Sequence, residues 1–224
     1  ISLRSNYAHR GGGLFYNNSS IEGYIYASTI NNNEASTGAG IVAYGPLLIH
    51  NSTISGNYAD GSIGGISNHT NLRLSNVTIA MNSDVNLFNE TTLGNVQIRN
   101  TIIAAEKNAD NPVNCINNGV WTSGGYNLFN DNTCPTSGTG DLANTDPRLT
   151  PLAGLEGAGG GYGITETHGL LSGSPAHDHR PSACQEYNTW TVTIDQRGKN
   201  REGACDTGAF EGVAYVNYLP FAKK

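Results

Sequence analysis

The sequence predicts an all-β protein, a right-handed parallel β-helix (β-solenoid) with coils of 24–27 residues. Two rows of residues that recur with the same period carry this prediction. One row is aliphatic, and its steps are 27, 24, 25 and 24 residues: Leu3, Ile30, Ile54, Ile79 and Ile103. The other row is asparagine and follows the same steps: Asn6, Asn33, Asn57 and Asn82.

Further rows within each period indicate short strands. One lies five residues before the later aliphatic residues and consists of Ile25, Ile49, Leu74 and Ile98. Another consists of Leu14, Ile41, Ile66 and Leu87. Apolar residues alternate around these positions, and Gly, Asn and Ser separate the runs, which favours three short strands per coil over helix. Stacked coils would turn the aliphatic rows into interior core ladders and the asparagine row into a turn ladder of side-chain amides.

Composition excludes several classes of protein. The chain has 224 residues, 13% of them charged, and a net charge of −6, which argues against nucleic acid and anionic membranes as partners. No apolar stretch of about 18 residues occurs, so we expect no membrane span. The chain begins at Ile1 without a signal peptide, and we expect a processed or truncated piece of a precursor.

The period divides the chain into three parts. We expect repeat coils over residues 1–105, irregular C-terminal coils and loops of the same domain over 106–212, and a strand-like tail over 213–224. The apolar and aromatic residues of this tail are Val213, Tyr215, Val216, Tyr218, Leu219 and Phe221. Such a tail either docks on its own domain or adds to the exposed strand edge of another copy.

The four cysteines indicate disulfides, because their spacing contains no CxxC motif for zinc or thiol redox chemistry. Three connectivities are possible, and we expect neighbours to pair, Cys115 with Cys134 and Cys184 with Cys205, each closing a loop of about 20 residues. Disulfides persist in oxidising compartments, which predicts an extracellular or cell-surface location.

Five ordered motifs carry a resemblance to a known family. They are GYNL at 125–128, TDP at 145–147, GSPA at 173–176, DQRG at 195–198 and CDTGAFE at 205–211. Together they resemble the choice-of-anchor Q domain proteins of bacterial surfaces. The resemblance implies a right-handed parallel β-helix, similar in fold to pectate lyases, and a surface location without a shared catalytic site. His177 departs from the pattern, because it stands where the family has an apolar residue.

One candidate metal site is the sequence HDHR at 177–180. On a strand, His177 and His179 would share a face and hold a metal together with a further ligand such as His168 or Asp178. We favour the alternative, two exposed loop histidines, because no third ligand is set by the spacing. We therefore expect no metal and no cofactor.

The acidic residues offer two candidate catalytic sites. Asp195 and Asp206, with Arg197 and Arg201, form either a catalytic cluster or structural ion pairs that join turns, and we favour the structural role. Asp60 and Asp84 follow the asparagine turn on adjacent coils but are one residue out of register, so we expect a solvated turn there.

We therefore expect a non-enzymatic extracellular structural or interaction protein, with roles such as adhesion or filament formation. Its partners would be copies of itself, joined head to tail through the open coil ends and the tail. The alternative is a polysaccharide-binding or polysaccharide-degrading β-helix, which a cleft lined by Tyr16, Tyr24, Tyr26 and Tyr44 would support.

Overall fold

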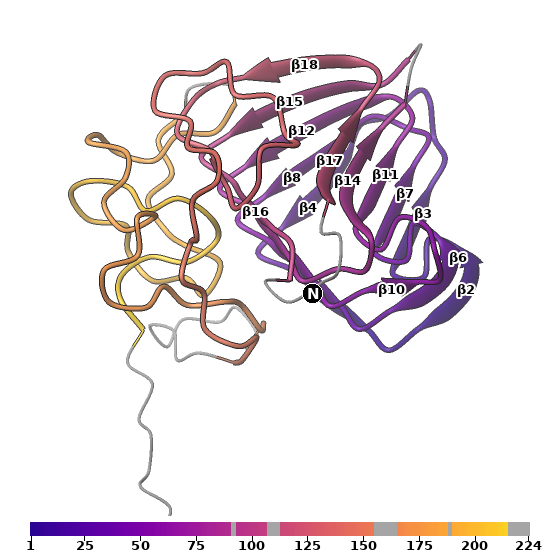
Figure 1. Cartoon of the computed structure of the whole chain (residues 1–224), viewed down its shortest axis with the longest axis horizontal. Coiled ribbons are helices and arrows are strands. Elements are labelled where there is room, and N and C mark those ends of the chain that lie inside the picture. Colours follow the sequence, from indigo (N-terminus) through magenta and orange to yellow (C-terminus); the bar gives the residue numbers. More distant parts are fainter. Residues whose placement is uncertain (91–92, 107–112, 155–164, 188–189, 215–224) are drawn as a thin grey trace, which may run out of the picture.

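The computed structural model describes residues 1–90, 93–106, 113–154, 165–187 and 190–214. These residues form a parallel β-solenoid of about five turns, with no helix among them. Successive coils lie side by side, as the change from indigo to pink along the strands of Figure 1 shows. The fold class predicted from the repeat is therefore confirmed.

Four parallel sheets form the sides of the solenoid, and we name them A to D. Sheet A contains β1 (Ser2–Arg4), β5 (Thr29–Asn31), β9 (Thr53–Ser55), β13 (Thr78–Ala80), β16 (Ile102–Ala104) and β19 (Leu128–Phe129). Sheet B contains β2 (Tyr7–Arg10), β6 (Glu34–Thr37) and β10 (Tyr58–Ala59). Sheet C contains β3 (Leu14–Tyr16), β7 (Ile41–Ala43), β11 (Ile66–Asn68), β14 (Val85–Asn89) and β17 (Val113–Asn117). Sheet D contains β4 (Gly23–Tyr26), β8 (Leu47–His50), β12 (Asn71–Ser75), β15 (Asn95–Arg99) and β18 (Val120–Ser123).

The strand register places the aliphatic rows in columns. In sheet A, Leu3 pairs with Ile30, Ile30 with Ile54, Ile54 with Ile79, and Ile79 with Ile103. Ile30, Ile54, Ile79 and Ile103 are at most 1% exposed and belong to one continuous core. Like side chains stack on like because the period of the sequence matches the circumference of the coil.

The asparagine row forms a directional ladder at the corner after sheet A. Asn33 Nδ2 donates to Asn57 Oδ1 at 2.9 Å, and Asn57 Nδ2 donates to Asn82 Oδ1 at 2.8 Å. The same amides also donate across the coil, Asn57 Nδ2 to the carbonyl of Ile30 at 3.0 Å. From Asn82 the ladder passes to Asn86 and then to Asn114. Each amide group therefore satisfies buried backbone and side-chain groups of two coils.

Two features differ from the sequence-based expectation. The first three coils have a fourth strand, which forms sheet B and packs through small side chains such as Ala35 and Ala59. The coils also continue beyond residue 105, to Phe129, which pairs with Ile103. The repeat was not visible there because Cys115 and Trp121 occupy the positions of Leu87 and Val96.

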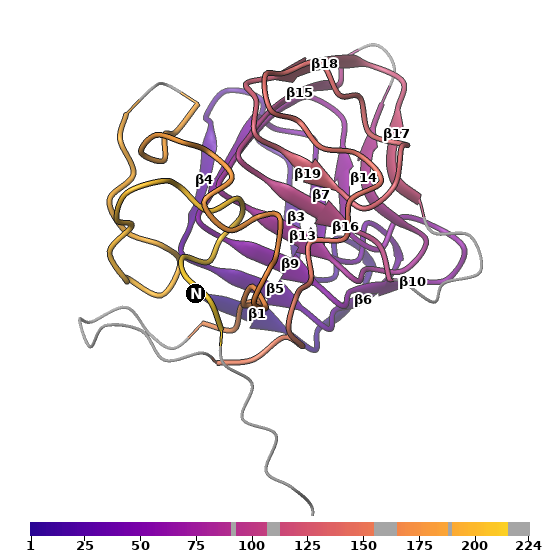
Figure 2. The ribbon, with the colours of Figure 1, turned by 60° about the vertical axis from the view of Figure 1, so that its left-hand side comes forward.

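The described residues of the segment 149–214 lie against the outer face of sheet A (Figure 2). Apart from isolated bridges, its described residues form turns and loops. Gln196, which is fully buried, joins this segment to sheet A. Its Oε1 accepts a hydrogen bond from the Thr53 hydroxyl at 2.6 Å, and its Nε2 donates to the Thr29 hydroxyl at 3.0 Å. Phe210 and Leu170 pack with residues of β13, β16 and β19 in a second apolar cluster.

The two predicted disulfide pairs are present. Cys115 is bonded to Cys134, and Cys184 to Cys205. The first lies in the core of the solenoid, and the second lies in the C-terminal segment beside Val192. Each bond therefore holds an irregular part of the chain that has no repeat to stack on.

Candidate interaction surface

One edge of the solenoid is open in the described chain. The strands β1, β2, β3 and β4 each pair with one neighbour only. We call their free side the N-terminal edge. A cleft of about 440 Å³ lies there, and its lining is mainly the apolar and aromatic side chains of this first coil, among them Leu3, Leu14 and Ile25.

Core positions at this edge are incompletely covered. Leu3, Leu14 and Ile25 are only partly buried, whereas their partners in the next coil are at most 1% exposed. Apolar side chains that are exposed beside unpaired strands are typical of an association site.

The asparagine ladder also ends at this edge. Asn6 donates through both its backbone N–H and its Nδ2 to Asn33 Oδ1, at 3.1 and 2.9 Å. The amide oxygens of Asn33, Asn57 and Asn82 each accept from the preceding coil, whereas the exposed Asn6 accepts no hydrogen bond through its oxygen from a described residue. The N-terminal edge therefore offers an acceptor to a further strand or amide.

The opposite edge, formed by β17, β18 and β19, is covered by residues 130–142. Asn114 donates to Asn130 Oδ1 at 2.8 Å and, through its backbone N–H, to Asp131 Oδ2 at 2.9 Å. The N–H of Phe129 donates to the carbonyl of Leu142 at 2.8 Å. Within the described chain, residues 130–142 thus cover the last coil, whereas no described residue pairs with the free side of β1–β4.

The predicted assembly tail is described only at its start. Val213 forms a parallel bridge with Leu170, and the N–H of Ala214 donates to the carbonyl of Leu170 at 2.8 Å. The other residues of this prediction, Tyr215, Val216, Tyr218, Leu219 and Phe221, lie outside the described residues.

Three of the four tyrosines of the polysaccharide hypothesis meet in the cleft of the N-terminal edge. They are Tyr16, Tyr24 and Tyr26, of which Tyr24 is 60% exposed. Tyr44 lies elsewhere and stacks on the ring of His69, with 4.2 Å between ring centroids. The cleft named in the polysaccharide hypothesis is therefore lined by three of its four tyrosines, and Tyr44 is not among them.

A hydrogen-bonded chain that the sequence did not reveal lies beside Tyr44. Ser67 Oγ is 3.0 Å from His69 Nε2, and His69 Nδ1 contacts the carboxylate of Glu90. This is the order of groups in a serine hydrolase triad. However, Ser67 is only 3% exposed on the outer face of sheet C, between Val42 and Phe88. A substrate carbonyl has no approach to its oxygen, so the chain is a structural network.

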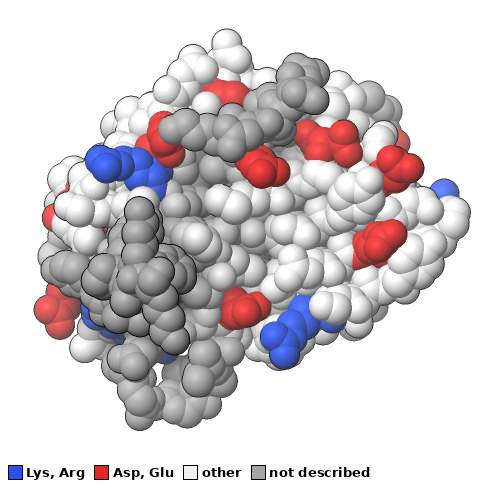
Figure 3. Space-filling model, turned by 60° about the horizontal axis from the view of Figure 1, so that its bottom comes forward, with Lys and Arg blue, Asp and Glu red and all other residues white. Residues whose placement is uncertain are grey.

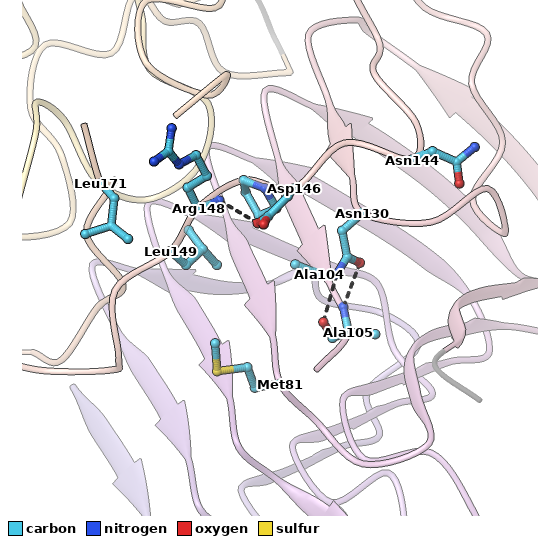
Figure 4. Close-up of a pocket in the computed structure, with 10 residues that line it drawn as sticks. Met81, Ala104, Ala105, Asn130, Asn144, Asp146, Arg148, Leu149 and Leu171 are labelled. Atoms are coloured by element: carbon cyan, nitrogen blue, oxygen red, sulfur yellow. Dashed lines mark hydrogen bonds between the residues drawn. The ribbon is translucent and has the colours of Figure 1, made fainter. Parts of the chain in front are cut away.

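A cavity of about 400 Å³ lies on the outer side of sheet A (Figure 4). Its polar side chains hold the surrounding loops. Asn130 Nδ2 donates to the carbonyl of Ala105 at 2.9 Å, and the N–H of Ala105 donates to Asn130 Oδ1 at 3.0 Å. Asp146 accepts a hydrogen bond from the N–H of Arg148 at 2.8 Å. Among the described residues that line this cavity, Asp146 is the one carboxylate, whereas a glycosidase uses a pair.

Two buried ion pairs involve the DQRG and CDTGAFE motifs and Arg201, which lies between them in the sequence. Asp195 accepts from Arg197 Nη2 at 2.6 Å, and the Arg197 guanidinium lies 3.7 Å from the centroid of the Phe210 ring. Arg201 donates to Glu211 at 2.8 Å, while burial raises the pKa of Glu211 to about 7. Since Asp195 also accepts three backbone N–H groups, these pairs join turns, as the structural interpretation predicts.

The two histidines of HDHR point to different places. His177 Nδ1 is 3.3 Å from Asp178 Oδ2, whereas His179 Nδ1 is 2.8 Å from Thr207 Oγ1 and its ring meets Tyr126 edge to face. The segment is not a strand, because Asp178 has a positive φ of 51°, so alternation does not apply. The metal hypothesis for His177 and His179 required a strand, and this condition is not met. His177 is an exposed loop residue, as in the favoured alternative, whereas His179 is half-buried. His168, the other ligand considered, is buried against Thr150 and Ser55.

The two acids on adjacent coils, Asp60 and Asp84, are both exposed. Asp84 forms an antiparallel bridge with Ile63. This arrangement agrees with a solvated turn. In the described part of the face shown in Figure 3, charged side chains are scattered over a mostly uncharged surface.

No family model matches the chain, and no curated protein matches it. In the ranges that the structure describes, no helix has the length and apolar character needed to cross a membrane.

Proposed function

We propose that this chain is a non-catalytic extracellular structural or interaction protein, a β-solenoid subunit that assembles through its N-terminal edge. The observation that carries the proposal is the combination found there. Four half-paired strands surround an apolar cleft, and the amide oxygen of Asn6 accepts no hydrogen bond from the part of the chain that the structure describes. Unpaired strand edges of this kind accept a strand from another molecule.

The occupant we propose for this edge is the C-terminal tail of a second copy, residues 213–224. Its sequence alternates apolar and aromatic residues before Pro220, as a strand that adds to an edge does. Because residues 130–142 cover the strands β17–β19, these strands cannot pair with the N-terminal edge of another copy. The tail is therefore the element that we propose to pair with that edge. A contact between tail and N-terminal edge is heterologous, so it leads to open, head-to-tail filaments.

Two further observations support this class of function. The disulfides suit an extracellular or cell-surface location. The buried carboxylates Asp195 and Glu211 are each engaged by an arginine, which suits a scaffold better than acid–base catalysis. Membership of the choice-of-anchor Q surface proteins remains part of this proposal and rests on the five sequence motifs.

Assembly is measured by light scattering after gel filtration and by negative-stain microscopy at rising protein concentration. We expect filaments from the full chain, and monomers from Leu14→Lys and from a chain without residues 213–224. Phe15→Lys is the matched control, because Phe15 lies on the same strand but points outward and is 46% exposed. A full chain that stays monomeric, or filaments that survive the tail deletion, would contradict the proposal.

The second candidate function is polysaccharide binding at the same edge. Tyr16, Tyr24 and Tyr26 favour it, since aromatic rings bind the apolar faces of sugars. Affinity electrophoresis in gels that contain neutral or acidic polysaccharides tests it. Tyr24→Ala should abolish retardation, whereas Tyr58→Ala, which removes a 52% exposed tyrosine from sheet B, should not.

A further inference from the structure

A second cleft, of about 430 Å³, lies in the C-terminal segment, away from the N-terminal edge. Carboxylates of Asp178, Glu202, Asp206 and Glu211 line it together with His177. Lys199 also reaches the cleft, and Arg201 is already paired with Glu211. The cleft is therefore acidic and open to solvent.

Asp206 differs from the other buried acids of the described chain. Those acids are Asp195, Asp206 and Glu211, and two of them have an arginine partner. Asp206 is 1% exposed, and its oxygens accept the backbone N–H groups of Asp178 at 2.6 Å and Gly212 at 2.5 Å. No lysine or arginine forms an ion pair with it among the described residues. Arg201, whose charge also acts on Asp206, is paired with Glu211, so the direct partners of the buried Asp206 carboxylate are backbone N–H groups. A bound cation would compensate its charge.

Two further metal-ligating groups stand beside Asp206. Ligand atoms of His177, Asp178 and Asp206 all lie within 4.8 Å of one another. Metal–ligand distances of about 2.0–2.2 Å separate two ligands of one ion by roughly 3–4.4 Å. The three groups thus need little movement to bind the same ion, and the backbone N–H bonds already fix the carboxylate of Asp206.

We propose that His177, Asp178 and Asp206 bind a divalent cation of the zinc type, with water in the remaining position. One imidazole and two carboxylates form a mixed donor set, which suits Zn²⁺ better than the all-oxygen sets of Ca²⁺ or Mg²⁺. The ion neutralises Asp206 and ties the turn at residues 177–178 to the segment that follows Cys205. This site is independent of the assembly proposed above.

The test is titration of the full, untagged chain with ZnCl₂ after treatment with chelator, by calorimetry and by thermal unfolding. We expect one saturable site and a rise in the unfolding temperature. His177→Ala and Asp178→Asn replace exposed ligands without touching the buried Asp206, so both variants should fold. Each should weaken binding at least about 10-fold.

His179→Ala is the matched control, because His179 lies two residues away and faces Thr207. It should bind Zn²⁺ as the wild type does. Absence of a saturable site in the wild type would overturn the proposal, as would equal affinity in His177→Ala. If Lys199→Ala is needed before any Zn²⁺ binds, the lysine is the native counter-ion of the cleft and the proposal fails.

Discussion

The asparagine ladder allows a sharp test of what holds the coils together. The side chain of Asn57 makes four hydrogen bonds, of 2.8 to 3.1 Å, to Ile30, Asn33 and Asn82. The side chain of Asn6 makes one, to Asn33 at 2.9 Å, and is exposed. Both residues stand in the same ladder, so Asn57→Ala and Asn6→Ala compare a buried with an open position.

The magnitude follows from these bonds. A buried hydrogen bond contributes about 1 kcal/mol, and a buried polar group left without a partner costs about 1–3 kcal/mol. Asn57→Ala removes four bonds and orphans the carbonyl of Ile30, so the free energy of unfolding should fall by about 4 kcal/mol. Asn6→Ala removes one bond that water can replace, so the loss should be at most about 1 kcal/mol.

Urea unfolding followed by far-ultraviolet circular dichroism measures both losses of unfolding free energy. The slope of the unfolding free energy against urea concentration should be the same in both variants and the wild type, which checks that unfolding stays cooperative. Equal destabilisation by the two variants would refute the reasoning. It would mean that amide side chains in the ladder are no more than solvated turn residues.

Three other predictions concern the core, the disulfide and acid stability. Ile54→Ala should lower the free energy of unfolding by about 3 kcal/mol, because it opens a cavity in the core. Leu3→Ala, at a partly buried position of the first coil, should lower it by less than about 1.5 kcal/mol, and urea unfolding measures both changes. Replacing both Cys115 and Cys134 by Ala should cost about 3 kcal/mol, since their bond closes a loop of 19 residues, and a change below about 1 kcal/mol in calorimetry would contradict this. Burial lowers the pKa of His50 to about 4 from 6.5, so the unfolded chain gains a proton first and stability is lost as pH falls from 6.5 toward 4. His50→Phe should remove up to about 3 kcal/mol of this pH dependence, and a pH profile identical to that of the wild type would disprove the assignment.

The solenoid was predictable because its contacts are periodic. Residues that touch, such as Ile30 and Ile54 or Asn33 and Asn57, are one coil apart, so a period of 24–27 residues in the sequence becomes a column in space. The prediction ended at residue 105 because Cys115 and Trp121 broke the aliphatic pattern, although the strands continue to Phe129. Disulfide pairing was also accessible, since each pair closes a short loop.

Periodicity alone predicts the fold class and the core and turn rows, because stacking makes each coil repeat the side chains of the last. The short loops favoured the observed cysteine pairing among three possible connectivities. The three-dimensional contacts add that β1–β4 are half-paired within the described chain, whereas residues 130–142 cover the last coil. They also place His179 against Thr207, away from His177, and bring Asp206 beside His177. These contacts join residues of the irregular C-terminal segment, where positive-φ turns replace strand alternation and no period relates one neighbour to the next.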